Sequence, residues 1–287
     1  MQMQRIAAFT RNGTGGNPAG VVIADALPSP ARMQEVAARV GYSETAFAAP
    51  EGDAWRVRYF APEAEVPFCG HATIALGAAL ARMRGPGRFR LELAAGPIAL
   101  EADLRDGIAS ARLWSPPTRH APAPAGLLDA ALALFGHRPE DLEPDLPPML
   151  AHAGADHLIL PLRGRGLLSR MRYDLEAGRR LMQAHGLVTV ALIWRERERL
   201  FHARNAFASG GVIEDPATGA AAAALAGALR DAGRLPAGGL TVLQGDDMGT
   251  PSTIETRFTA TPGSPVEVAG ATAEIGAVAA RYPGRPA

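Results

Sequence analysis

Two stretches of the sequence carry almost no polar side chains, and both are long enough to form a helix. They run from His71 to Leu80 and from Ala220 to Leu229. A helix that is apolar on every side is buried on every side, so each stretch is predicted to be the central helix of a domain. The segments that precede them are also alike, since each combines carboxylate, proline and glycine: Glu65-Val-Pro-Phe-Cys-Gly70 and Glu214-Asp-Pro-Ala-Thr-Gly219.

Short runs of residues that favour β-strands surround both predicted helices. They cover residues 89–93, 98–102, 109–114, 158–160, 188–194, 240–243 and 254–258. The simplest arrangement is an α+β fold of two similar domains, each a twisted, barrel-like sheet wrapped around one apolar helix. The proline-rich stretch 116–124 is the predicted connection, which gives domains of residues 1–116 and 117–287. The alternative is a coincidental likeness between two alanine-rich helices.

A third helix is predicted near the start of the chain from its end signals. Ser29 and Pro30 are typical of an N-cap and a first helical position. Met33 and Val36 follow at helical spacing, and Gly41 stands where a helix C-terminus favours glycine. The segment that begins at residue 43 therefore follows directly after a helix.

Charge and composition exclude several classes of function. The 287 residues include 29 basic and 29 acidic side chains, so no net charge attracts nucleic acid or a membrane surface. Every basic residue is arginine, and without lysine the chain cannot act through a pyridoxal-phosphate aldimine, a P-loop or a side-chain Schiff base. The chain begins without the apolar run of a signal peptide, and its longest small-apolar stretch is too short to cross a bilayer. We therefore expect a cytoplasmic protein.

No sequence pattern indicates a metal, dinucleotide or serine-hydrolase site. The seven histidines lack the spacing of zinc motifs, and Cys69 is the only cysteine. The glycine-rich segment 13–20 is predicted to be a turn, because Pro18 and the β-branched residues after it oppose a helix there. A Gly-x-Ser-x-Gly elbow is absent from the sequence. We therefore expect neither a metal nor a cofactor.

Three ionisable residues remain as candidates for chemistry: Glu44, His71 and Asp215. Glu44 follows the first predicted helix, whereas His71 and Asp215 flank the starts of the two central helices. The start of a helix offers unpaired N–H groups and a partial positive charge, which suit a carboxylate or a developing oxyanion. Each residue also has a simpler interpretation, as a solvated glutamate, a helix-capping histidine and a turn-forming aspartate.

Seven motifs, which occur in the family's order, resemble the PhzF family of phenazine biosynthesis within the diaminopimelate epimerase-like superfamily. They extend from Arg5 to Ser252, nearly the whole chain. The motifs are Gly16-Asn-Pro-Ala-Gly-Val21, Leu27 to Gln34, Ser43-Glu-Thr-Ala-Phe47, Tyr59-Phe-Ala-Pro62, Glu65-Val-Pro-Phe-Cys-Gly-His-Ala-Thr73, Glu214-Asp-Pro-Ala-Thr-Gly219 and Gln244-Gly-Asp-Asp-Met-Gly249. The resemblance implies two barrels, each closed around a helix, with the active site in the cleft between them. It also implies a homodimer, and a last strand that can return to the first domain.

The same resemblance implies a cofactor-independent isomerase that acts on a small metabolite with a carboxylate. Glu44 matches the glutamate that takes a proton from one substrate carbon and returns it to another. His71 and Asp215 match residues that bind polar groups of the substrate, which in phenazine biosynthesis is a dihydro-hydroxyanthranilate. The resemblance places further substrate contacts at Asn17, Gly70, Gly219 and Ala220.

The sequence departs from the family pattern close to the expected pocket. Ala220 stands where the family has a serine, and Thr250 stands where arginine is common. The substrate can therefore differ from that of phenazine biosynthesis. Two alternatives stay open: an amino-acid epimerase or racemase that uses Cys69 as a base, and a small-molecule-binding homologue without turnover. A two-thiol racemase is excluded, and a buried, inert thiol is the simpler interpretation of Cys69.

Overall fold

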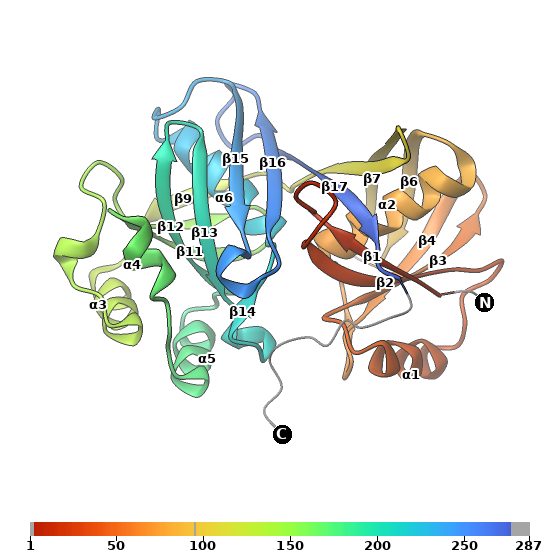
Figure 1. The fold of residues 1–287 in the computed structure, drawn as a ribbon, viewed down its shortest axis with the longest axis horizontal. Helices are drawn as coiled ribbons and strands as arrows, with labels where there is room; N and C mark the ends of the chain where they lie inside the picture. Colours follow the sequence, from red (N-terminus) through yellow and green to blue (C-terminus); the bar gives the residue numbers. More distant parts are fainter. Residues whose placement is uncertain (1–2, 95, 277–287) are drawn as a thin grey trace. The chain divides into compact units, whose positions relative to one another are not determined.

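The computed structural model describes residues 3–94 and 96–276 and divides into two compact units (Figure 1). Unit 1 combines the residues up to Trp114 with the segment that begins at Ala269, and unit 2 covers Ser115–Val268. The observed boundary thus lies between Trp114 and Ser115, in place of the expected 116/117, and the chain re-enters unit 1 after residue 268. Among the described residues, no helix has the length and apolar character needed to cross a membrane.

Unit 1 is a β-barrel closed around one helix. Its strands are hydrogen-bonded in the order β1–β2–β3–β4–β6–β7–β8–β17, and β17 pairs with β1 to close the ring. The pairs β2–β3 and β4–β6 are parallel. The elements are β1 (Met3–Ala8), β2 (Asn17–Ile23), α1 (Pro30–Val40), β3 (Thr45–Glu51), β4 (Ala54–Phe60), β5 (Glu65–Val66), α2 (Gly70–Arg84), β6 (Gly87–Leu93), β7 (Gly96–Arg105), β8 (Ile108–Trp114) and β17 (Glu267–Glu274).

Helix α2 occupies the inside of this barrel and packs against β1, β2, β3, β7 and β8 (Figure 1). Its residues from His71 to Ala81 are all buried. The strands approach so closely that a Cβ at Gly77 would lie 2.8 Å from the Cβ of Ala111 and 2.9 Å from a methyl group of Leu100. Only glycine fits at that position without displacing the strands. The prediction of a central apolar helix is confirmed.

Unit 2 repeats the plan with additional helices. Its strands follow the order β9–β10–β11–β12–β13–β15–β16, with the short β14 paired to β13; β11–β12 and β13–β15 are parallel. The elements are β9 (Arg119–Pro122), α3 (Ala125–Phe135), the 3-10 turn η1 (Pro139–Asp141), β10 (Met149–His152), β11 (Asp156–Leu162), α4 (Arg165–Ser169), α5 (Leu175–Ala184), β12 (Thr189–Arg197), β13 (Leu200–Ala206), η2 (Ala208–Gly210), β14 (Glu214–Asp215), α6 (Gly219–Asp231), β15 (Gly238–Gln244), η3 (Asp246–Met248) and β16 (Ser252–Phe258).

Helix α6 is the central helix of unit 2 and packs against β9, β10, β11, β15 and β16. A Cβ at Gly227 would lie 2.7 Å from the side chain of Thr118, so the backbone again approaches its surroundings closely. A second core forms where α3 and α5 contribute Phe135 and Met182 to a cluster with Leu160 and Leu192 of β11 and β12. The expected α+β class, with two similar units that each wrap a sheet around an apolar helix, is confirmed.

In each unit, an arginine and a glutamate form an equivalent salt bridge just before the central helix in the chain. In unit 1, the guanidinium of Arg58 on β4 binds both carboxylate oxygens of Glu65 on β5, at 2.6 and 2.5 Å. In unit 2, Arg204 on β13 binds Glu214 on β14, with Nε at 3.0 Å from Oε1. Two parallel N–H···O contacts fix the orientation of both groups. The likeness between the two sequence segments is therefore a repeat in three dimensions.

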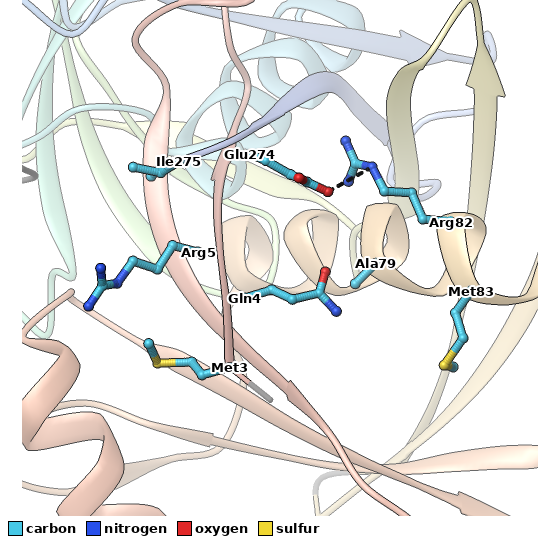
Figure 2. A pocket seen from close by; sticks show the side chains of 8 residues that line it. All are labelled: Met3, Gln4, Arg5, Ala79, Arg82, Met83, Glu274 and Ile275. Carbon is cyan, nitrogen blue, oxygen red and sulfur yellow. Dashed lines mark ion pairs between the residues drawn. The ribbon is translucent and has the colours of Figure 1, made fainter. Parts of the chain in front are cut away.

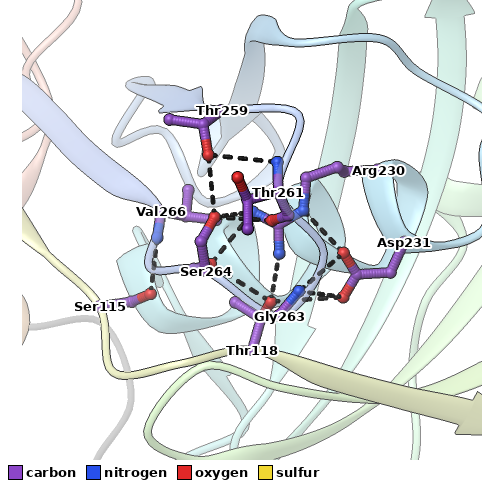
Figure 3. A network of polar contacts seen from close by, with 9 residues as sticks. All are labelled: Ser115, Thr118, Arg230, Asp231, Thr259, Thr261, Gly263, Ser264 and Val266. Carbon is purple, nitrogen blue, oxygen red and sulfur yellow. Dashed lines mark hydrogen bonds and ion pairs between the residues drawn. The ribbon is translucent and has the colours of Figure 1, made fainter.

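A buried arginine connects the two segments through which the chain enters and leaves unit 2 (Figure 3). Arg230 donates from Nη2 to the hydroxyl of Thr118 at 2.7 Å, and from Nη1 to the carbonyl of Ser264 at 3.0 Å. Its Nε lies 2.7 Å from Asp231, which also accepts a hydrogen bond from the N–H of Gly263. Only 2% of the Arg230 side chain is exposed, so these partners replace water in stabilising the positive charge of its guanidinium.

Arg230→Met should lower the free energy of unfolding by about 3 kcal/mol, because the substitution leaves the half-buried Asp231 without its cation. Urea unfolding followed by circular dichroism measures the change. Arg257→Met, at an exposed position of β16, is the matched control and should change stability by less than about 0.5 kcal/mol. Equal unfolding midpoints for the two variants would contradict a stabilising role for the Arg230 network.

Candidate active site

Three side chains from two distant segments meet at the start of α2; we refer to Glu44, Cys69 and His71 as the Glu44 cluster. Glu44 directly precedes β3, Cys69 is the N-cap of α2, and His71 lies in its first turn. The Cys69 thiol donates to Oε2 of Glu44 at 3.3 Å, and its sulfur lies 3.3 Å from Nδ1 of His71. Nε2 of His71 lies 3.4 Å from the same Glu44 oxygen. Two residues that the sequence suggested separately are therefore neighbours.

The parallel pairing of β2 and β3 holds the backbone at Glu44. The N–H of Gly20 on β2 donates to the carbonyl of Glu44 at 3.2 Å. A Cβ at Gly20 would lie 2.6 Å from the hydroxyl of Thr45, so only glycine allows the two strands this approach. The preceding Ser43 places its hydroxyl 3.2 Å from Nε2 of His71. The chain on both sides of Glu44 is thus fixed to β2 and to α2.

Buried hydroxyl groups hold the first turn of α2. Thr73 donates to the carbonyl of Cys69 at 2.7 Å, and the phenol oxygen of Tyr59 lies 2.6 Å from the Thr73 hydroxyl. Burial raises the pKa of Tyr59 far above its usual range, so this phenol stays protonated. The backbone of Cys69 is therefore held in place from inside the barrel.

Burial sets the charge of His71. It lowers the pKa of His71 below its ordinary value, and the negative charge of Glu44 only partly opposes this. The imidazole is therefore neutral near pH 7, with one ring nitrogen as a donor and the other as an acceptor. The side chain of His71 is 9% exposed and that of Glu44 is 16% exposed. Glu44 is thus the more accessible of the two to a solute.

Asp215 belongs to a second group, at the start of α6 in unit 2. The hydroxyl of Thr218, the N-cap residue, donates to Oδ2 of Asp215. Gln244, which is 1% exposed, donates from Nε2 to the carbonyl of Asp215 at 2.6 Å. The same Gln244 accepts a hydrogen bond from the N–H of Thr218 at 3.2 Å. One buried amide therefore fixes the turn that carries Asp215 into the helix.

The other predicted positions divide between the two units. Gly70 lies in the first turn of α2, and Gly219 and Ala220 lie in the first turn of α6; all three are partly exposed. Neither N-cap side chain bonds to its helix, so the first-turn amides of both helices carry no side-chain cap. Asn17 begins β2 in unit 1 and is fully buried. The substrate-binding roles of these four residues stay predictions.

Known proteins share both the sequence pattern and the fold of this chain. Residues 6–276 match the PhzC-PhzF family, which is described as phenazine biosynthesis-like protein. This chain belongs to the PhzC-PhzF family. An uncharacterized isomerase of Deinococcus radiodurans is 37% identical over 265 residues, which cover 87% of this chain and 84% of the relative.

Two further PhzC-PhzF comparisons concern activity and fold. The trans-2,3-dihydro-3-hydroxyanthranilate isomerase of Pseudomonas fluorescens is 32% identical over 257 residues, which cover 86% of each chain. The crystal structure of a PhzF-family phenazine biosynthesis protein from Bacillus anthracis matches with a TM-score of 0.83 and 25% identity, covering 96% of this chain and 98% of the other. The chain therefore has the fold of a family whose relatives are named isomerases.

A surface pocket of this PhzC-PhzF protein lies near the other end of α2 (Figure 2). Its volume is about 620 Å³, and Arg82 forms an ion pair across it with Glu274 at 3.2 Å. The residues that line it are Met3, Gln4, Arg5, Ala79, Arg82, Met83, Glu274 and Ile275. The Glu44 cluster lies at the N-terminal start of the same helix. This pocket is therefore separate from the grouped ionisable residues, whose chemistry identifies the candidate site.

Sequence reasoning did not identify Thr218 and Gln244 as site residues. The repeat contained a signal for Thr218, because Thr218 and Cys69 both directly precede the glycine that begins a central helix. It contained none for Gln244, whose contacts to the 215–218 turn come from a strand far along the chain. Motif spacing could not predict the Glu44 cluster either, since its members come from separate segments.

The contact between Glu44 and His71 leads to a prediction that can be tested without a substrate. Glu44→Gln removes a negative charge that favours the imidazolium, so the pKa of His71 should fall further below its ordinary value. An NMR titration of the ring C–H signals measures this pKa. Glu51→Gln, at an exposed position of β3, is the control and should leave it unchanged. A His71 pKa that stays constant or rises in Glu44→Gln would contradict the described contact.

Proposed function

We propose that this protein is a cofactor-independent isomerase that moves a proton between carbons of a small carboxylate-bearing metabolite, with Glu44 as the general acid and base. The observation that carries the proposal is the Glu44 cluster, in which a carboxylate is held beside a neutral imidazole at an uncapped helix start. Family membership supports the reaction class, because relatives over nearly the whole chain are named isomerases.

The proposed reaction balances without any other reactant. The Glu44 carboxylate removes a proton from a substrate carbon, and the electron pair of that C–H bond enters the conjugated system of the substrate. The resulting carboxylic acid then gives the proton to a different carbon of the same system. The substrate is neither oxidised nor reduced, so the step needs no nicotinamide, flavin or metal redox partner.

The surroundings of Glu44 suit this reaction. Negative charge develops on the substrate when the proton leaves, and the amides and partial positive charge at the start of α2 would stabilise it. The neutral His71 can hold a polar substrate group as either donor or acceptor. The uncapped start of α6, with Gly219 and Ala220, would hold the substrate carboxylate, and Asp215 would bind another polar group.

One contact bears on the alternative of a Cys69-dependent racemase. The Cys69 thiol lies 3.3 Å from the Glu44 carboxylate, so the two groups would meet the same face of a bound substrate. Inversion at a carbon by two bases requires one proton carrier on each face. The adjacency therefore favours a proton shift on one face by Glu44, and it gives Cys69 the role of a neighbour to the carboxylate.

Proton exchange with deuterated water tests the role of Glu44. We expect wild-type protein in D2O to exchange a carbon-bound proton of at least one compound in a set of unsaturated and hydroxylated carboxylic acids, as followed by proton NMR. Glu44→Gln should lose at least about a hundredfold in exchange rate while it keeps its circular dichroism spectrum, because general acid–base catalysis contributes at least that much. Glu51→Gln is the matched control and should exchange at the wild-type rate.

Cys69→Ala, in the same assay, separates the two mechanisms. We expect this variant to keep exchange within about tenfold of the wild-type rate, since the proposal assigns the proton to Glu44. Lost exchange in Cys69→Ala together with retained exchange in Glu44→Gln would overturn the proposal in favour of the thiol. A wild-type protein that binds acids from the set but exchanges no proton would favour the non-catalytic homologue.

A further inference from the structure

The Glu44 cluster has a second chemical property besides proton transfer, since its three members are three different kinds of metal ligand. A thiol, an imidazole and a carboxylate each offer one donor atom, and these atoms all lie within 4.8 Å of one another. Zn²⁺ prefers this combination of sulfur, nitrogen and oxygen donors in proteins. Among the described residues, this is the group of ionisable side chains whose geometry fits a metal ion.

The separations between the donor atoms resemble those around a tetrahedral zinc ion. Zinc bonds of about 2.0–2.3 Å place neighbouring donors about 3.3–3.6 Å apart. In the Glu44 cluster, the sulfur of Cys69 lies 3.3 Å from Oε2 of Glu44, and Nε2 of His71 lies 3.4 Å from that oxygen. The third separation, from sulfur to Nε2, is 3.9 Å and would need to close by a few tenths of an ångström. Because the sulfur is closer to Nδ1, at 3.3 Å, the His71 ring would also turn so that Nε2 faces the ion.

The charges also balance, although one local feature opposes a cation. A Cys69 thiolate and the Glu44 carboxylate would supply two negative charges to a divalent ion, while His71 enters as a neutral ligand. The start of α2 carries roughly half a positive charge, which repels the cation but favours the thiolate. Cys69 and His71 are both buried, and the more open Glu44 gives an ion its access from solvent.

We propose that Glu44, Cys69 and His71 form a binding site for a thiophilic divalent ion of the zinc class. Three protein ligands leave a fourth tetrahedral position open to water or to an anionic solute. Mg²⁺ and Ca²⁺, which require oxygen ligands, would not compete. If Glu44 is the proton carrier, as proposed above, an ion on its carboxylate blocks proton transfer. The ion would therefore inhibit the enzyme reversibly, and this consequence alone rests on the proposed function.

Cobalt binding tests the site without any substrate. Addition of Co²⁺ to the purified, reduced protein should produce the thiolate-to-cobalt charge-transfer band and the intense visible bands of tetrahedral cobalt, saturating at one ion per chain. Zn²⁺ should displace Co²⁺ stoichiometrically, whereas a large excess of Mg²⁺ should not. Cys69→Ala should lose the charge-transfer band, and Glu44→Gln should weaken Co²⁺ binding at least about tenfold while retaining that band. His120→Gln, at an exposed position of β9, should bind as wild type.

Several results would overturn the proposal. Absence of the charge-transfer band in wild type would do so, as would Cys69→Ala binding Co²⁺ with wild-type affinity. If Cys69→Ala fails to fold, the Glu44→Gln titration decides alone, and unchanged affinity in that variant counts against the site. In the exchange assay, stoichiometric Zn²⁺ should stop exchange and a chelator should restore it. If the charge-transfer and tetrahedral cobalt bands are absent, the metal site is refuted whatever the exchange assay gives. If those bands appear but the protein exchanges no proton, only the proposed function is refuted.

Discussion

Each unit depends on the burial of a helix that is narrow enough for a sheet to close around it. In α2 and α6, alanine and glycine occupy many of the buried positions that hold large side chains in an ordinary core helix, and the sheet supplies much of the remaining bulk. Gly77 and Gly227 mark the positions where even a methyl group would collide with neighbouring residues. A helix enclosed in this way can offer chemistry only at its ends. The partly exposed first turns at Gly70 and Gly219 are therefore the natural places for a ligand.

Burial at the start of α2 also decides which charges meet there. A protonated His71 only 3.4 Å from Glu44 would form an ion pair and would compete with any substrate for the carboxylate. Burial in the barrel prevents this, because it lowers the pKa of the imidazole and keeps the ring neutral. The same apolar packing that stabilises the fold thus leaves Glu44 beside neutral donors and acceptors. That environment suits a carboxylate that must lose and regain a proton.

Elements whose signals are local could be predicted from the sequence, and contacts between distant segments could not. The helix from Pro30 to Val40 begins after Ser29 and ends before Gly41, as expected, and composition alone predicted the two central helices. Strand β17 closes the barrel of unit 1, yet its sequence Glu267–Glu274 has little β-branched character, and its pairing is fixed by β1 and β8. Only the family resemblance implied its return.

Long-range contacts likewise limit what could be predicted of the candidate site. Glu44 and His71 were each identified from local context, but nothing in their spacing indicates that the two contact each other or that Cys69 lies beside both. The absence of a metal was expected from sequence spacing, a criterion that cannot detect donors from separate segments. The role of Gln244 was not predicted, because no sequence pattern indicates which glutamine side chains are buried and hydrogen-bonded.

The repeat gives the two helix starts the same backbone and different side chains, and this difference separates their chemistry. The N-cap hydroxyl of Thr218 donates to Asp215, a carboxylate in its own turn, and Gln244 fixes that turn further. The N-cap thiol of Cys69 donates instead to Glu44, a carboxylate from a different segment. A thiol is a weaker donor than a hydroxyl, so its bond is more easily exchanged for one to a substrate. A carboxylate held firmly within its turn is suited to bind, and one held by a weak donor is suited to carry a proton. The local contacts therefore favour Glu44 over Asp215 as the proton carrier in the proposed reaction.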